Sequence, residues 1–155
     1  MIKEFENLND TEKEIMYQAP ALVTVLVAGA DNKIDKQEVE KALSLAELKT
    51  YRSRRVLRDY YQEVFKTFEK QFLELVMELP ETAEERNPLI EEKLRRINFI
   101  FPKLDKKFSQ QFYASLLDFS KTVAEASGGI LGYFAISAEE NKYVNLRMIR
   151  RPEGE

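Results

Sequence analysis

Apolar residues recur along most of the chain three or four positions apart, and short polar or proline-containing stretches separate these runs. Such spacing places apolar side chains on one face of a helix. Three runs predict helices that end before Pro80, at Pro102 and at the glycines after Ser127. Their expected buried positions are Leu57, Tyr61, Val64, Phe68, Phe72, Leu75 and Leu79; Ile90, Leu94, Ile97 and Phe101; and Phe108, Phe112, Leu116, Phe119 and Val123.

The N-terminal part of the chain predicts two more helices. The apolar stretch 19–30 is shorter than the roughly 20 residues that a membrane-spanning helix needs, so we expect a buried core helix there. Thr11 and Glu14 form a capping-box pattern at its start, and Pro20 is expected to kink or split it. A short helix that ends near Leu48 should follow.

The C-terminal part predicts one more helix. Ser137 and Glu140 form a capping pattern for a helix that carries Val144 and Met148. Residues 1–10 and 151–155 are expected to be flexible ends. We therefore predict an all-α fold, with residues 1–155 forming one compact, single-domain bundle of about six to seven helices.

Composition restricts the possible chemistry. The 155 residues include no Cys and no His, which excludes an imidazole base, a cysteine nucleophile, a Ser-His-acid triad and a His- or Cys-ligated zinc site. We expect a protein that is not an enzyme. The net charge of −3 argues against nucleic acid as a partner. The acidic N-terminal segment lacks the apolar region of a signal peptide, so we expect a cytoplasmic protein with no transmembrane segment.

The acidic turn DNKIDKQE, from Asp31 to Glu38, matches the second half of a calcium-binding EF-hand loop. On that frame Asp31, Asp35 and Glu38 occupy ligand positions, whereas Val27 and Gly29 fall where the first two ligands belong. The turn can therefore hold a divalent ion of the calcium or magnesium type only weakly.

A second interpretation of the turn needs no metal. Asp35 can cap the following helix while Glu38 reaches back to it, with Ile34 and Val39 packed around the cap. The pattern IDKQE recurs as ISAEE, which ends at Glu139 and Glu140. If the two turns face each other their acids can form one site, and otherwise both are simply helix caps.

The segment YRSRRVLR contains four arginines: Arg52, Arg54, Arg55 and Arg58. Arginines clustered at the start of a helix can bind an acidic protein, a phosphate or the headgroups of an anionic membrane. They can equally form a solvated face paired with neighbouring acids.

Two segments, APALVTVLVAGADNKIDKQEVEKAL at 19–43 and ASGGILGYFAISAEENKY at 126–143, resemble the two ends of the bacterial tellurite-resistance TerB family. The resemblance implies a compact helical fold from bacterial stress operons, with roles in toxic-oxyanion resistance or phage defence and no defined reaction. It also implies metal binding at Asp31, Asp35 and Glu38, with Glu139 and Glu140 as partners. Asn32 stands where the family commonly has Gly; Asn also tolerates the left-handed backbone conformation.

Two hypotheses follow. In the first, the protein is a non-enzymatic, TerB-like stress-response domain that binds a divalent metal weakly through the acidic turn and works with partner proteins. In the second, it is a structural interaction module with no metal, and its arginine-rich face docks a protein partner or an anionic membrane surface.

Overall fold

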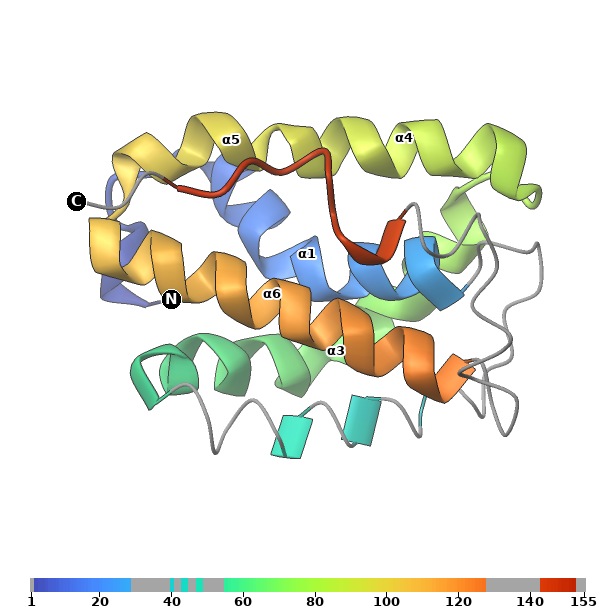
Figure 1. Ribbon diagram of the computed structural model, residues 1–155, viewed down its shortest axis with the longest axis horizontal. Helices are drawn as coiled ribbons and strands as arrows, with labels where there is room; N and C mark the ends of the chain where they lie inside the picture. Colours follow the sequence, from blue (N-terminus) through green and yellow to red (C-terminus); the bar gives the residue numbers. More distant parts are fainter. Residues whose placement is uncertain are drawn as a thin grey trace.

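The computed structural model describes residues 2–28, 40, 43–44, 47–48, 55–127 and 143–152. Its elements (Figure 1) are the 3-10 turn η1 (Lys3–Phe5), α1 (Asp10–Ala28), η2 (Arg55–Leu57), α3 (Arg58–Glu78), α4 (Ala83–Arg95), α5 (Ile97–Ile100), η3 (Phe101–Lys103) and α6 (Lys106–Ser127). The described residues between 40 and 48 are also helical. No described residue lies in a strand, so the predicted all-α class is confirmed for this part of the chain.

Helix α1 is the central element of the core. It contacts α3, α4, α5 and α6, and every residue from Ala19 to Ala28 is buried. This confirms the buried helix expected from the apolar stretch, because neighbours on several sides leave no solvated face for polar side chains.

Pro20 does not split α1, contrary to one of the expected outcomes. Because Pro20 has no N–H, it cannot donate the usual helical hydrogen bond to the carbonyl of Met16. The Tyr60 hydroxyl donates to that carbonyl instead, at 2.5 Å. Burial raises the pKa of Tyr60 well above its ordinary range, so the hydroxyl keeps its proton. A side chain of α3 thus replaces the missing backbone donor.

The cap of α1 lies two residues earlier than predicted. The Asn9 side chain accepts from the Glu12 N–H at 2.8 Å, and the Glu12 carboxylate accepts from the Asn9 N–H at 2.9 Å. This reciprocal pair is a capping box that uses Asn, among the most favourable N-cap residues. The Glu12 carboxylate also accepts from Lys103 Nζ at 2.7 Å, and this contact with Lys103 is the largest cause of its lowered pKa.

The N-terminal residues are packed into the core, although residues 1–10 were expected to be a flexible end. Phe5 has no exposed surface, and Ile2 and Leu8 are buried too. The Phe5 ring makes edge-to-face contacts with Tyr17, Tyr60 and Phe108. An aromatic side chain in such a cluster anchors the short η1 turn, whose sequence alone has no helical period to reveal it.

The apolar stripes of α3 and α6 are buried as predicted. On α3 the buried positions include Tyr61, Val64, Phe68, Phe72 and Leu75. On α6 they are Phe108, Phe112, Leu116, Phe119 and Val123. The Tyr61 and Ser115 hydroxyls share a buried hydrogen bond of 2.6 Å, which joins the two helices inside the core.

The helix predicted to end at Pro102 is divided into three elements. Thr82 caps its start as expected, accepting from the Glu85 N–H at 3.3 Å. The helix breaks at Arg96, whose N–H bonds the Lys93 carbonyl three residues back. After this tighter turn the chain continues as α5 and η3, with Pro102 inside η3. The buried face nevertheless continues through Ile90, Leu94, Ile97 and Ile100.

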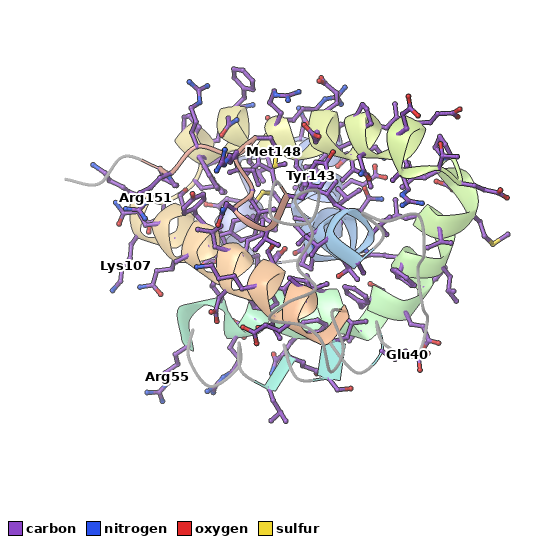
Figure 2. All side chains as sticks on the ribbon, turned by 45° about the vertical axis from the view of Figure 1, so that its right-hand side comes forward. Glu40, Arg55, Lys107, Tyr143, Met148 and Arg151 are labelled. Carbon is purple, nitrogen blue, oxygen red and sulfur yellow. The ribbon has the colours of Figure 1, made fainter. Side chains whose placement is uncertain are left out.

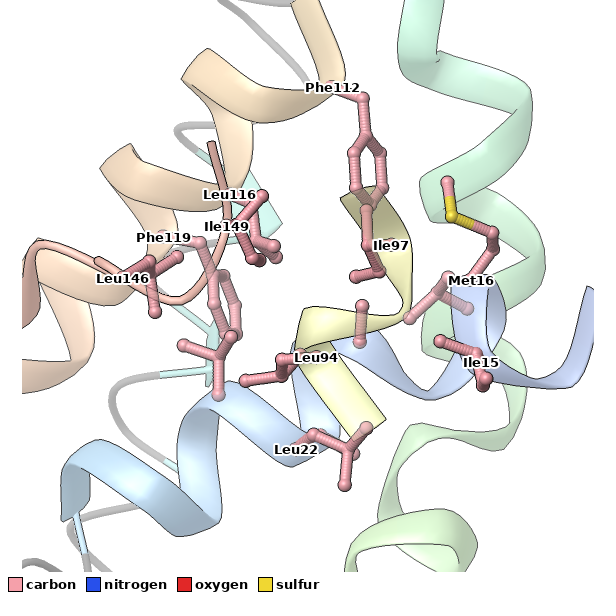
Figure 3. Packing of buried hydrophobic residues seen from close by; sticks show 14 of the residues in the cluster. Ile15, Met16, Leu22, Leu94, Ile97, Phe112, Leu116, Phe119, Leu146 and Ile149 are labelled. Carbon is pink, nitrogen blue, oxygen red and sulfur yellow. The ribbon is translucent and has the colours of Figure 1, made fainter. Parts of the chain in front are cut away.

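Residues 143–152, the C-terminal strap, lie between α6 and the α4–α5 layer (Figure 1). Only Tyr143 and Val144 are helical, so the helix predicted through Met148 is wrong beyond Val144; Ser137 and Glu140 lie outside the described residues. Leu146 has a φ of 46°, an uncommon conformation for a bulky residue. Its fully buried side chain explains why the chain turns there: Leu146 and Ile149 point toward Leu116 and Phe119 (Figure 3).

Candidate functional site

All five predicted metal ligands lie outside the described residues: Asp31, Asp35, Glu38, Glu139 and Glu140. Within the described ranges, no group of three or more acidic side chains is placed to hold a metal ion. The described residues that flank the two acidic segments can be located. Ala28 ends α1, Ser127 ends α6 and Tyr143 begins the strap, and all three lie toward the same end of the molecule (Figure 1).

Of the four predicted partner-binding arginines, Arg55 and Arg58 are described and Arg52 and Arg54 are not. Arg55 lies in η2 and Arg58 opens α3, and both side chains are exposed. The η2 turn contacts α6. The arginines therefore lie beside a second helix rather than on an isolated face.

Helices α3 and α6 begin at the same end of the molecule (Figure 1), and Lys106 and Lys107 stand at the start of α6. Figure 2 shows Arg55, Lys107 and Arg151 along one side, and Glu40 on the opposite side. We call this set of exposed side chains the basic end: Arg55, Arg58, Lys106, Lys107, Arg150 and Arg151. Three segments far apart in sequence contribute to it, namely the start of α3, the start of α6 and the C-terminal strap.

Two pockets adjoin the strap, and Arg151 of the basic end lines both of them. The first, of about 480 Å³, lies between α5, η3, the start of α6 and the strap. The second, of about 590 Å³, lies on the α6 side. Their polar and charged lining residues are Asn98, Lys106, Ser109 and Arg150 in the first, Gln110, Asp118 and Lys121 in the second, and Arg151 in both.

Asn98 fixes the strap in place. Its side-chain amide donates to the Met148 carbonyl at 2.8 Å, and its carbonyl oxygen accepts from the Arg150 N–H at 2.7 Å. One asparagine thus pairs with the strap backbone on both sides of Ile149. Further along the chain, Ser120 Oγ donates to the Val144 carbonyl at 2.8 Å. These bonds position Arg150 and Arg151 against α6.

Two acidic residues near the basic end, Asp59 and Asp105, interact with the N-terminal ends of helices. The Asp105 carboxylate accepts from the Phe108 N–H at 3.1 Å and caps α6. Asp59 lies in the first turn of α3, where a negative charge favours the helix dipole. Lys103, which we leave out of the basic end, is paired with Glu12. The six side chains of the basic end therefore present a surplus of positive charge to solvent.

Two shifted pKa values belong to tyrosines of the aromatic core, Tyr17 and Tyr60. Burial raises the pKa of Tyr17 to about 12, and a hydrogen bond to Glu63 adds to the shift. The Tyr17 hydroxyl also accepts from the Ile2 N–H at 3.1 Å. Tyr17 thus holds the N-terminal segment against α1 and α3.

The basic end can bind an anionic group by charge and by the donors of its guanidinium and ammonium groups.

Sequence reasoning found part of this site. Local charge density predicts the arginine cluster, but it does not distinguish Lys106–Lys107 or Arg150–Arg151, because each is only a pair of cations in an otherwise mixed segment. Two adjacent cation pairs are a weak signal. The contacts that hold Arg150 beside α5 are made by Asn98, which no local sequence pattern distinguishes.

The comparisons with known proteins add no relative: no protein-family model matches the chain, and neither the curated proteins nor the solved structures contain a significant match. The fold and the basic end therefore define the protein only as an all-α chain with a cationic surface at one end. No helix in the described part of the chain has both the length and the apolar character needed to cross a bilayer.

Proposed function

We propose that this protein is a non-enzymatic helical interaction module whose basic end binds an acidic surface of a partner protein. The observation that carries the proposal is that exposed cations from the start of α6 and from the strap, namely Lys106, Arg150 and Arg151, line the 480 Å³ pocket together. Clustered charges of one sign accelerate the encounter with an oppositely charged partner and fix its orientation.

The composition around the pocket favours a protein partner. Arginine forks bind carboxylates through two parallel hydrogen bonds. Phe99, which follows Asn98 in α5 but does not line the pocket, is 67% exposed, which is unusual for a phenylalanine. Aromatic and arginine side chains are the residues that most often dominate the binding energy of protein interfaces. An acidic partner surface with an apolar centre would use both.

Charge reversal at the basic end tests this proposal. We expect Lys107→Glu with Arg151→Glu to weaken binding of the partner at least about tenfold, because attraction becomes repulsion at the basic end. Partners would be identified by affinity capture with quantitative mass spectrometry, and dissociation constants measured on purified complexes. The matched control is Lys66→Glu with Lys70→Glu, an equal charge change on exposed positions of α3. Equal losses in both variants would contradict the proposal.

The TerB-like resemblance supplies a biological setting for the module. We propose a cytoplasmic bacterial stress-response protein, with weak divalent-metal binding by the acidic turn as a second candidate function. The specific observation in its favour is that Ala28, Ser127 and Tyr143, which flank both acidic segments, lie toward one end of the molecule. Asp31, the first acid of the acidic turn, lies three residues after Ala28. Glu140, the last acid of the second segment, lies three residues before Tyr143.

Melting curves test the metal proposal. An ion that binds only the native state at ten times its dissociation constant adds about 1.4 kcal/mol, or about 3–6 °C for a chain of this size. We expect calcium, magnesium or manganese to raise the melting temperature relative to EDTA. Asp31→Asn with Glu38→Gln should abolish the rise. The metal proposal fails if no ion changes the melting temperature, or if the double variant responds like the unmodified protein.

A further inference from the structure

An apolar groove lies on another part of the surface, between α3 and the helical residues of 40–48. Its volume is about 200 Å³. The lining residues are Glu40, Leu43, Ser44 and Glu47 on one wall, and Phe65, Phe68, Glu69 and Phe72 on the other. It lies outside the basic end, and none of its lining residues belongs to the two pockets beside the strap.

Three phenylalanines form the α3 wall of the groove. Phe65 and Phe68 contact each other at 5.9 Å between ring centroids, and Phe68 stacks on Phe72 at 6.4 Å. Phe68 and Phe72 also belong to the core, so this wall is held rigidly from behind. Ligand pockets for small molecules are usually larger, roughly 300–1,000 Å³. The groove therefore suits a single bulky side chain better than a free small molecule.

Exposed apolar side chains extend the groove on both walls. Val76 follows Phe72 by one helical turn on α3 and is 37% exposed, as is Leu73 beside it. On the other wall Leu48 follows Glu47 and is 54% exposed. Large apolar side chains that lie together at a surface mark sites where another molecule binds. The line from Phe65 to Val76 matches the direction of an added helix lying along α3.

The charges that line the groove are all acidic. Glu40, Glu47 and Glu69 stand at its rim, and no cation is among its described lining residues. Lys66 and Lys70 are the nearest cations along α3. At 3.6 residues per turn they lie more than about a quarter of a turn around the helix from Phe65 and Phe72. A partner that fits the groove must therefore carry an apolar anchor and flanking positive charge.

We infer that this groove binds an amphipathic helix of a partner protein, with a bulky apolar residue inserted between Leu43 and Phe72 and with lysine or arginine side chains facing Glu40, Glu47 and Glu69. Helices of this kind dock in apolar grooves through residues spaced three, four and seven positions apart. The acidic rim selects a basic helix and disfavours an acidic one, since like charges at an interface cost binding energy. This surface is independent of the basic end and has the opposite charge preference.

The probe is a synthetic helical peptide of roughly 15 residues with leucines at i, i+4 and i+7, lysines beside them, and alanine and glutamine on the remaining positions. Its binding to the full chain is measured by fluorescence anisotropy, and the binding site is mapped from amide shifts in NMR spectra. We expect saturable binding with a dissociation constant on the order of 10–100 μM. The shifts should be concentrated at the described residues of 40–48 and at 65–76 of α3.

Two changes separate the groove from general charge attraction. Glu40→Lys with Glu69→Lys should weaken binding of the peptide at least about tenfold. The control is Glu74→Lys with Glu78→Lys, an equal charge change on exposed residues of α3, which should change binding less than about twofold. Replacing the central leucine of the peptide with asparagine should also weaken binding at least about tenfold, without any change to the protein.

Three results would overturn the inference. The first is no saturable binding, and the second is an equal loss in the two double lysine variants. The third is a dimer of the protein alone, detected by sedimentation, that Glu40→Lys with Glu69→Lys dissociates. In that case a second copy of the chain would be the occupant. Circular dichroism of each variant should match the unmodified protein, since all four glutamates are at the surface.

Discussion

Tyr60 stabilises α1 in two ways. Its ring lies in the aromatic cluster, edge-on to Tyr61 and Phe112, and its hydroxyl donates to the Met16 carbonyl that Pro20 leaves without a helical partner. A buried carbonyl with no donor costs about 1–3 kcal/mol. The presence of Pro20 in the sequence predicts a break. Pro20 cannot reveal the compensating donor, because Tyr60 lies 44 residues beyond Met16 in the chain.

Tyr60→Phe should therefore lower the free energy of unfolding by about 1–3 kcal/mol, although it removes only one oxygen atom. In a Pro20→Ala background the same change should cost less, because residue 20 then supplies the N–H that bonds the Met16 carbonyl. Urea unfolding of the four proteins in this cycle gives the coupling energy. A cost for Tyr60→Phe that is equal in both backgrounds, within about 0.5 kcal/mol, would show that Pro20 and Tyr60 are not coupled.

At the scale of elements, the C-terminal strap depends on a few hydrogen bonds and two buried side chains, Leu146 and Ile149. The amphipathic stripes of α3 and α6 could be predicted, because a helix with one buried face repeats its apolar residues every three or four positions. The strap could not. The strap backbone pairs with the Asn98 side chain, and Leu146 adopts a left-handed conformation that no pattern in the surrounding sequence predicts.

Asn98→Ala should detach the strap locally. Two hydrogen bonds are lost, each worth about 0.5–1.5 kcal/mol, so the free energy of unfolding should fall by about 1–3 kcal/mol. Exchange of the Arg150 amide hydrogen should also accelerate. Asn98→Asp is the control, since it keeps the acceptor for the Arg150 N–H and removes the donor to the Met148 carbonyl. In this variant the Arg150 amide should exchange at a rate between those of the unmodified protein and Asn98→Ala. Unchanged exchange at Arg150 in Asn98→Ala would contradict this role of Asn98.

At the scale of the whole molecule, charge is distributed unevenly. Cations lie along the side of the molecule that holds Arg55, Lys107 and Arg151 (Figure 2), and the acidic groove lies along a different part of α3. Local sequence predicted the arginine cluster from four charges within seven residues. It could not predict the rest of the basic end, because Lys107 and Arg151 lie on the same side of the molecule as Arg55 only in the folded chain. The metal ligands proposed in the acidic turn lie outside the described residues, so that part of the site stays a prediction.

The central claim is that the basic end binds acidic protein surfaces. The most direct measurement is an NMR titration of the isotope-labelled chain with a glutamate-rich peptide that carries one central aromatic residue. We predict amide shifts concentrated at Asn98, at Lys106–Lys107 and at Arg150–Arg151, which disappear in Lys107→Glu with Arg151→Glu and persist in Lys66→Glu with Lys70→Glu. Shifts spread evenly over the cations of the chain, or centred on the acidic groove, would contradict the claim.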